Sequence, residues 1–317
     1  YAKEVKVVIE HFKFANYYYI AHSGLLWNKS KALNFAASKT KGEFIFVADV
    51  DICFHKRAVA TLLNSHRKDG FTLFKLSYLK EKKQQSVIQT SNIRATDIKH
   101  HGSVNGMVLV SKENFFKVNG YDEFYHFYGS EDVDFYERLT HLGLQKQVNT
   151  ETLFYHQWHP IYNSIDDSVL EKTPRFFNIK RINQQHFFYQ KKENVIYPIL
   201  DQKINDIVWY KKDRLCPEDA VKSFSVKNDH AKVWHLLEVV FPNLKNEVIQ
   251  ITVEEDEYFN SLKFKLKKKF KKPDRVPISM KQVNDLLLKQ ILLKYRDHNY
   301  TYTISDSLTQ ITFIINT

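Results

Sequence analysis

The stretch Gly42-Glu43-Phe44-Ile45-Phe46-Val47-Ala48-Asp49-Val50-Asp51 decides the expected fold of this chain. Its apolar run, residues 44–48, is short and rich in aromatic and β-branched side chains, which is typical of a buried strand rather than a helix. Asp49 and Asp51 follow where that strand ends, and ligands bind at strand ends in open α/β sheets. Carboxylates placed there suit Mg²⁺ or Mn²⁺, whereas the alternative interpretation is an ordinary surface turn.

The segments around this strand predict an α/β fold. Asn28 is a good N-cap for a helix that ends before Gly42, and the β-prone residues 5–9 and 17–20 precede that helix. This strand–helix–strand order suggests a parallel α/β unit. Later strands are expected at 71–78, 104–110 and 153–155, helices at 55–68, 111–120 and 131–143, and a long polar loop at 80–101.

A change in composition divides the chain near residue 196. All eight glycines lie at or before Gly143, so the tight turns expected near ligands belong to the first part. We expect residues 1–196 to form one nucleotide-binding α/β domain and residues 197–317 to form a smaller α+β domain. In the second part, helices are expected at 229–241 and 280–295, and strands at 247–253 and 310–316.

The formal net charge of +11 favours acidic partners, such as nucleic acid, an anionic membrane surface or phosphorylated substrates. The densest basic block runs from Lys263 to Lys272. It is expected to be a solvated face or an amphipathic strand, and contact with an anionic membrane surface is an equal alternative. No recognition motif accompanies the block, so we disfavour nucleic acid.

Cysteine content and hydropathy indicate the compartment. Cys53 and Cys216 are too few for a disulfide framework and fit a reducing environment. No apolar run approaches the ~20 residues that a membrane span needs. These features predict a cytoplasmic protein, with peripheral membrane contact if the basic block binds lipid.

Two further clusters carry side chains that can do chemistry. Glu131, Asp132 and Asp134 open a helix, where acids complement the helix dipole and Ser130 can cap. The aromatic residues 121–128 before them suit a sugar, because sugar rings have apolar faces, and a carboxylate beside them can take a proton from an attacking hydroxyl. The second cluster, His156 and His159 beside Trp158, is a candidate metal site, although a single histidine is more often structural.

Together these motifs resemble the inverting GT-A glycosyltransferases, in particular the β-1,4-galactosyltransferases and the bacterial chondroitin-polymerase-like enzymes. Trp27-Asn28-Lys29-Ser30-Lys31-Ala32-Leu33-Asn34 and the strand ending in Asp49-Val50-Asp51 are similar to the nucleotide-sugar half of that family. The segment 118–135 is similar to its acceptor-side motif, and His156 falls where the family has its metal-binding histidine.

The resemblance implies a GT-A domain that moves a hexose or N-acetylhexosamine from a UDP-sugar to a hydroxyl of a glycan or lipid-linked glycan, using Mn²⁺ or Mg²⁺. It implies Asp51 and His156 as metal ligands, with His159 as a second choice. It implies donor contacts from Lys29, Asn34, Asp49 and Asp51; a catalytic base in Asp132, assisted by Glu131; and acceptor contacts from Tyr128, Glu131 and Asp132.

The chain departs from the family in its first element and in its acceptor turn. The strand and helix that precede residues 5–9 in the family are absent from this sequence, so we expect either a truncated chain or a loss of those elements. Phe127-Tyr128-Gly129-Ser130 stands in place of the family's Trp-Gly turn. The alternative function is a non-catalytic sugar- or polyanion-binding module on a degenerate GT-A scaffold.

Overall fold

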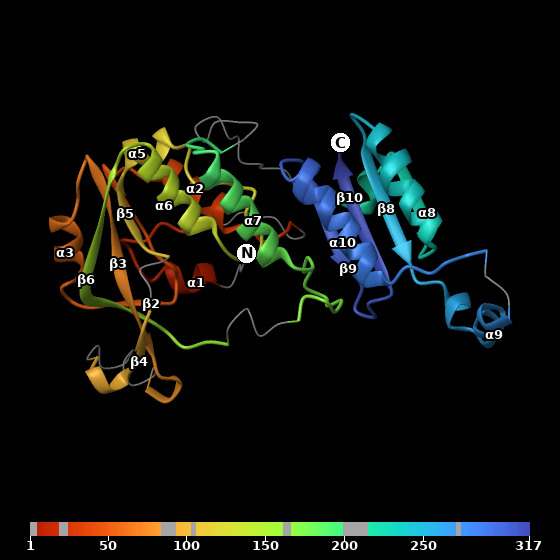
Figure 1. Ribbon diagram of the computed structural model, residues 1–317, viewed down its shortest axis with the longest axis horizontal. Coiled ribbons are helices and arrows are strands. Elements are labelled where there is room, and N and C mark those ends of the chain that lie inside the picture. The colour runs from red at the N-terminus through yellow and green to blue at the C-terminus, as the bar shows by residue number, and fades with distance from the viewer. Residues whose placement is uncertain are drawn as a thin grey trace. The chain divides into compact units, whose positions relative to one another are not determined.

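The computed structural model describes residues 5–18, 25–83, 93–102, 106–160, 166–198, 215–270 and 274–317. The chain forms two compact units, which we name by their sheets (Figure 1). The six-stranded unit contains residues 28–165 and 180–208, and the four-stranded unit contains residues 1–27, 166–179 and 209–317. This grouping differs from a boundary near residue 196. The four-stranded unit includes Leu26, far in the sequence from its residues 166–179 and 209–317. The backbone N–H of Leu26 donates to the Tyr300 hydroxyl of the same unit over 3.1 Å.

The six-stranded sheet is mixed, with the order β1-β5-β3-β6-β2, and β4 pairs with β3. β3 and β6 are parallel, whereas the other pairs are antiparallel. The parallel unit expected around the helix after Asn28 is wrong, because residues 5–9 form a helix and β1 pairs with β5 in the antiparallel sense. Its strands are β1 (Phe44–Val47), β2 (Ile52–Phe54), β3 (Gly70–Leu79), β4 (Ile98–His101), β5 (Val108–Ser111) and β6 (Gln145–His156).

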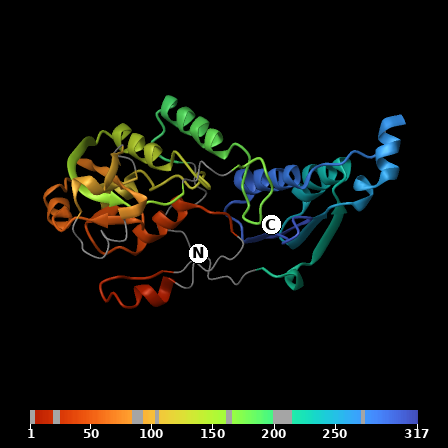
Figure 2. The same ribbon diagram turned by 90° about the horizontal axis from the view of Figure 1, so that it is seen from below.

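Helices cover both faces of this sheet (Figures 1 and 2). Alternation along β1 explains the layers, because Ile45 and Val47 pack into one hydrophobic cluster while Phe44 and Phe46 pack into another. The first cluster lies under α2 (Lys29–Lys39), α5 (Lys112–Lys117) and α6 (Glu131–His141). The second lies under α3 (Ala58–Asn64), and the unit is completed by α7 (Ile179–Lys192).

Two expected elements of the first 101 residues are wrong. Residues 5–9 form a helix, α1 (Val5–Ile9), with no buried side chain, so this run lacks the sheet neighbours on which strand formation depends. The expected loop 80–101 contains β4 and two short 3₁₀ helices, Glu81–Lys83 and Ala95–Asp97. Residues 84–92 of that loop, residues 103–105 and residues 19–20 of the early β-prone run lie outside the described residues.

The four-stranded sheet has the order β7-β8-β10-β9, in which only β7 and β8 are parallel. Its strands are β7 (Lys222–Lys227), β8 (Val248–Glu254), β9 (Tyr300–Ile304) and β10 (Gln310–Asn316). Helices α8 (His230–His235) and α10 (Met280–Gln290) pack on one face (Figure 2). Residues 263–270 of the basic block belong to a helix, α9 (Leu262–Phe270), so the amphipathic-strand interpretation is wrong there, and Lys271 and Lys272 lie outside the described residues. Among the described residues, no helix has the length and apolarity to cross a bilayer.

Candidate functional site

Strand register brings the first candidate ligands together. In the antiparallel pair β2–β6, Ile52 lies opposite His156, so Asp51, one residue earlier, lies beside the end of β6. The backbone N–H of Gln157 donates to the Asp51 carbonyl over 2.9 Å and fixes this placement. Asp49 thus follows the end of β1, as the sequence predicts, and Asp51 lies in the turn that leads to β2, a strand that was not expected.

Asp51, His156 and His159 form a cluster that could hold a metal ion, with one ligand atom from each residue within 4.8 Å of the others. The Nε2 atoms of His156 and His159 lie 3.4 and 3.2 Å from Oδ2 of Asp51. In both rings Nδ1–H donates to a backbone carbonyl, that of Gln157 at 2.6 Å and that of Pro160 at 2.7 Å. A neutral imidazole held in this way directs the lone pair of Nε2 into the cluster.

The residues of this cluster fit a divalent metal. Oδ1 of Asp51 is buried and has no hydrogen-bond partner, which is costly for a carboxylate unless a cation binds there. Two imidazoles with one carboxylate suit Mn²⁺ better than Mg²⁺, which prefers oxygen ligands alone. The structure thus brings together all three metal ligands expected from the sequence.

A second cluster joins the ends of three elements through Lys29. Its ammonium group lies 2.6 Å from Oδ1 of Asp49 and 3.7 Å from Oε1 of Glu131. Burial alone lowers the pKa of Lys29, but the charges of Asp49, Glu131 and Asp132 outweigh it and raise that pKa. Burial raises the pKa of Glu131 and of Asp132 above their ordinary values, and Lys29 opposes both shifts.

The helix that carries Lys29 is positioned by two buried asparagines. Oδ1 of Asn28 accepts from the Lys31 backbone N–H at 2.8 Å and caps α2, while Nδ2 donates to the Glu123 carbonyl over 2.8 Å. Asn34 is fully buried and exchanges hydrogen bonds with the Tyr121 backbone at 2.8 and 2.9 Å. Asn34 therefore supports the turn that leads to the acidic helix, and its expected donor contact stays a prediction.

The first turn of α6 separates acids with different roles. Ser130 has a positive φ of 74°, and its side chain makes no hydrogen bond that caps α6, so the expected N-cap is wrong. Oδ1 of Asp132 instead accepts from the Val133 backbone N–H at 2.8 Å. Asp134 points into the core, where its Oδ2 accepts from Arg138 Nε at 2.8 Å with both side chains 1% exposed. Asp134 is thus structural, whereas Glu131 and Asp132 face Lys29.

The acceptor-side loop is held against α7. The carbonyls of His126 and Tyr128 accept from Nδ2 of Asn183 at 3.1 and 3.0 Å. The ring of Tyr128 stays 40% exposed, with the Lys180 ammonium 5.9 Å from its centre. An exposed aromatic ring within electrostatic reach of Glu131 and Asp132 is suited to the apolar face of a sugar.

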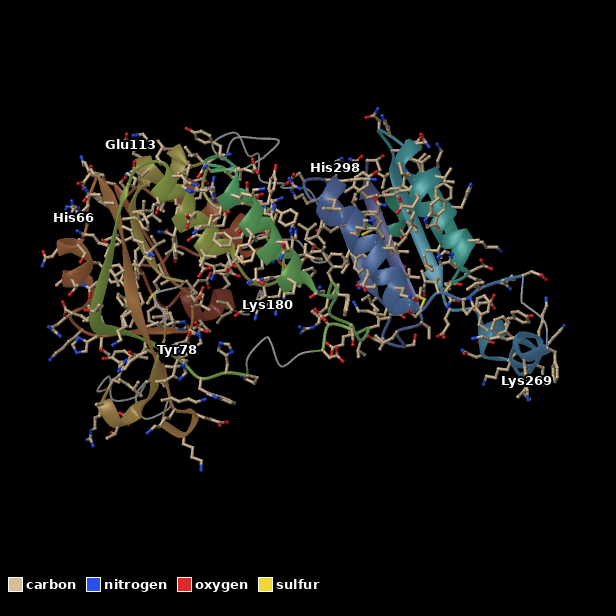
Figure 3. The ribbon with its side chains drawn as sticks, in the orientation of Figure 1. His66, Tyr78, Glu113, Lys180, Lys269 and His298 are labelled. Carbon is tan, nitrogen blue, oxygen red and sulfur yellow. The ribbon has the colours of Figure 1, made fainter. Side chains whose placement is uncertain are left out.

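Tyr78 is a site residue that the sequence did not single out. Tyr78, labelled in Figure 3, lies opposite His156 in the β3–β6 pair. Its ring centre is 4.8 Å from that of His156 and 4.6 Å from that of His100. Burial raises the pKa of the Tyr78 hydroxyl, and the charges of Asp49, Asp51 and Asp132 add to this effect. The Tyr78 hydroxyl is therefore within electrostatic reach of both clusters.

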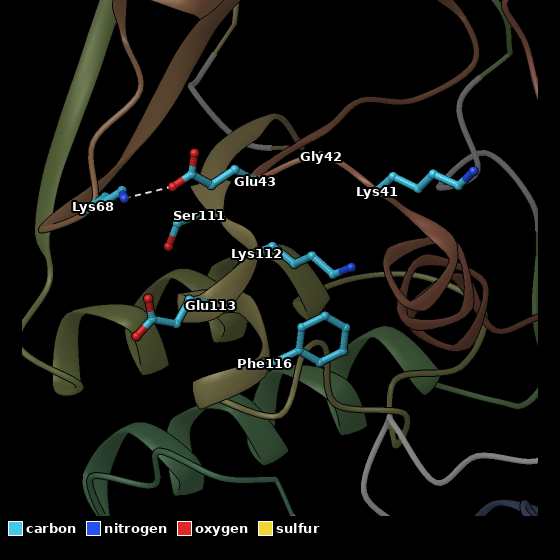
Figure 4. Close-up of a pocket in the computed structure, with 8 residues that line it drawn as sticks. All are labelled: Lys41, Gly42, Glu43, Lys68, Ser111, Lys112, Glu113 and Phe116. Carbon is cyan, nitrogen blue, oxygen red and sulfur yellow. Dashed lines mark ion pairs between the residues drawn. The ribbon is translucent and has the colours of Figure 1, made fainter.

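A pocket of about 450 Å³ lies elsewhere in the unit (Figure 4). Gly42 and Glu43 line it at the beginning of β1, whereas Asp49 follows the end of that strand. Its one short ion pair, between Glu43 and Lys68 at 2.7 Å, is exposed to solvent. This pocket is separate from both acidic clusters and contains none of their residues.

Residues 90–160 match the family model described as the N-terminal domain of galactosyltransferase. Similar solved structures include the catalytic domain of Drosophila beta1,4galactosyltransferase 7 in complex with xylobiose, at 22% identity and a TM-score of 0.33 over 51% of this chain and 62% of that chain. They also include a mutant of the Drosophila enzyme in complex with manganese, UDP-Gal and xylobiose, at 20% identity and a TM-score of 0.35 over 57% of this chain and 70% of that chain.

The chain thus spans less than two thirds of the first of these structures, at 62%. No curated protein matches the sequence. The family model covers β4, β5, α5, α6 and β6, and with them Glu131, Asp132, His156 and His159. In the segment that carries these four residues, the six-stranded unit is similar to the family described as the N-terminal domain of galactosyltransferase.

Proposed function

We propose that this protein is a metal-dependent inverting glycosyltransferase that moves a hexose or N-acetylhexosamine from a UDP-sugar to a hydroxyl of a glycan or glycolipid. The observation that carries the proposal is the Asp51–His156–His159 cluster, whose buried Oδ1 has no partner. The charge of Lys29 interacts with the acidic cluster of Asp49, Glu131 and Asp132. Burial raises the pKa of the Tyr78 hydroxyl, and charges from both this cluster and the metal cluster raise it further. These clusters together supply a metal site and a buried carboxylate base, the two groups on which metal-dependent transfer from a nucleotide-sugar relies.

The donor side uses the metal ligands and Lys29. Asp51, His156 and His159 would hold Mn²⁺, which when bound offsets the negative charge of the donor diphosphate. Lys29 lies at the first turn of α2 and is the cation nearest to Asp49, so Asp49 is available to accept from donor hydroxyls while its charge is balanced. With the charge of Asp49 balanced by Lys29 and that of Asp51 by the metal ion, these carboxylates would not repel the donor diphosphate.

The acceptor side uses Asp132 as the base. Its carboxylate takes the proton of the acceptor hydroxyl as that oxygen attacks the anomeric carbon from the side opposite UDP. The bond from the anomeric carbon to the diphosphate oxygen breaks, UDP leaves with the electron pair, and the configuration inverts. Burial raises the pKa of Asp132 and so strengthens it as a base near neutral pH. Glu131 and Tyr128 would hold the acceptor ring.

A binding panel and a transfer assay test the proposal on the full chain. We expect Mn²⁺ with UDP, and with one UDP-sugar above the others, to raise the melting temperature. We expect Asp132→Asn to keep this stabilisation and to lose UDP release in the presence of acceptors. Glu113→Gln is the matched control, because Glu113 is an exposed acid of the same segment that pairs with Lys117.

Two outcomes would contradict the proposal. No stabilisation by any UDP compound with Mn²⁺ would exclude a donor site. Stabilisation by glycans alone, without UDP release in any combination, would favour the non-catalytic binding module.

A further inference from the structure

Helix α9 of the four-stranded unit carries an exposed apolar stripe. Leu262, Leu266 and Phe270 are 77%, 56% and 78% exposed. They are four residues apart, and at about 3.6 residues per turn they span an arc of roughly 80° on one face. Three large apolar side chains aligned on one short helix are unusual for a surface that contacts only water.

Lysines flank this stripe on both sides. By the same helical spacing, Lys265 and Lys269 lie along one edge, and Lys263 and Lys267 lie along the other. Lys269 lies on the last turn of α9 (Figure 3). Lys267 also pairs with Asp274 at 2.9 Å, but the pair is exposed and therefore weak. Each ammonium group can extend past the apolar stripe on its own flexible stem.

The buried side chain of Phe264 fixes the direction in which the apolar stripe of α9 faces. Phe264 is 4% exposed, and its ring lies 5.4 Å from that of Tyr258 and 5.0 Å from that of Phe259. Helical spacing places Phe264 about 160° from the middle of the stripe. Because Phe264 points into the four-stranded unit, the stripe and its flanking lysines point away from it.

We propose that α9 binds the surface of an anionic lipid bilayer, with its axis in the plane of the interface. Leu262, Leu266 and Phe270 would enter the boundary between headgroups and acyl chains, and the flanking lysines would meet the lipid phosphates. The net charge of +11 complements such a surface. A soluble polyanion would satisfy the lysines but offers no apolar phase for the stripe, so the stripe decides between these partners.

The test measures flotation of the full chain with phosphatidylcholine vesicles and with vesicles that also contain phosphatidylglycerol. We expect binding only to the anionic vesicles, and we expect salt to weaken it, since exposed charges are screened. Replacing Leu262, Leu266 and Phe270 together by Ser should weaken binding at least about tenfold. The control replaces three exposed apolar residues of the same unit, Val221, Val276 and Leu293, by Ser and should bind as the wild type does.

A charge series completes the test. Changing Lys263, Lys265, Lys267 and Lys269 to Gln should also weaken binding at least about tenfold. Changing the exposed Lys232, Lys245, Lys289 and Lys294 to Gln removes the same charge elsewhere in the unit and should leave most of the binding. Absence of wild-type binding to anionic vesicles would overturn the proposal. It would also be overturned if the serine variant bound as wild type while heparin displaced both, because α9 would then bind a soluble polyanion.

Discussion

The ammonium group of Lys29 lies 2.6 Å from Oδ1 of Asp49, at the meeting point of the first turn of α2 and the end of β1. Glu131, from the first turn of α6, approaches the same ammonium group at 3.7 Å. Lys29 therefore joins three elements and brings a positive charge to the carboxylates of this site. Its charge opposes the rise that burial causes in the pKa of Glu131 and Asp132.

Lys29→Met should move the acid limb of the pH–activity profile to higher pH. Without the ammonium group, the pKa of Asp132 rises further above its ordinary value, and the base is active only when deprotonated. The measurement is kcat/KM against pH with saturating Mn²⁺. Lys39→Met removes an exposed charge from the last turn of the same helix and should leave the limb in place. A limb that stays fixed in Lys29→Met would show that Asp132 is not the group that titrates.

His156→Gln and His159→Gln should each weaken Mn²⁺ binding. Loss even of a group that orients a metal ligand costs about 10–100-fold in affinity, and loss of the ligand itself should cost at least as much. Calorimetric titration of Mn²⁺ into the nucleotide-free protein checks this without any turnover. His66→Gln is the control, because His66 is exposed and lies beside Phe44, at the beginning of β1, whereas Asp51 follows the end of that strand. Equal affinity in all four proteins would place the metal elsewhere.

Tyr78→Ala should also weaken Mn²⁺ binding, whereas Tyr78→Phe should retain it. The ring of Tyr78 lies between His100 and His156, so it holds the metal-binding imidazole in place by packing rather than through its hydroxyl. The same Mn²⁺ titration separates the two variants. If both lose affinity equally, the hydroxyl rather than the ring supports the site.

The elements that could be predicted from the sequence are those with a strong local pattern. β1, β3 and α6 each carry an apolar run or a helical repeat of buried side chains. Asp49 follows β1, Glu131 and Asp132 open α6, and His156 ends β6. This local pattern makes each of Asp51, Asp132 and His156 a candidate, whereas their grouping into one site was predicted from the resemblance to the GT-A glycosyltransferases. The pairing order of the strands has no such local signal, so the mixed sheet did not follow from the pattern.

The residues that the sequence could not assign depend on contacts between distant segments. Tyr78 becomes a site residue only through the register of β3 against β6. Asn34 is buried against Tyr121, a contact that a helical pattern does not reveal. Residues 5–9 have strand propensity but form α1, because propensity yields to the availability of a sheet partner.

Asp134→Ala should destabilise the protein and should not act primarily on catalysis. It leaves the Arg138 guanidinium without its carboxylate in a site where both side chains are 1% exposed. Removing one partner of a buried ion pair costs about 3–5 kcal/mol in the free energy of unfolding. Urea unfolding at neutral pH measures this cost, and Asp132→Asn should unfold close to the wild type. If Asp134→Ala changed the free energy of unfolding only slightly, the Asp134–Arg138 ion pair would contribute little, and apolar packing alone would hold α6 in place.

Asp122→Asn should change how stability depends on pH. Oδ2 of Asp122 accepts from His186 Nε2 at 2.9 Å and from Gln190 Nε2 at 2.8 Å. Burial would raise the pKa of this carboxyl, but the hydrogen bond and charge of His186 outweigh burial and lower the pKa below its ordinary value of 3.8. The native state therefore binds protons less readily than the unfolded state, and the carboxylate contributes stability above pH 3.8 that is lost as the pH falls through the native pKa.

The urea midpoints of wild type and Asp122→Asn should accordingly differ most near neutral pH and converge in acid. Asp166→Asn is the matched control: its carboxyl also has a lowered pKa, through Ser168, but it is exposed, so solvent screens the interaction and the two midpoints should stay close at every pH. A wild-type advantage over Asp122→Asn that persists unchanged into acid would show that Asp122 acts through the shape of its hydrogen bonds to α7 and not through its charge.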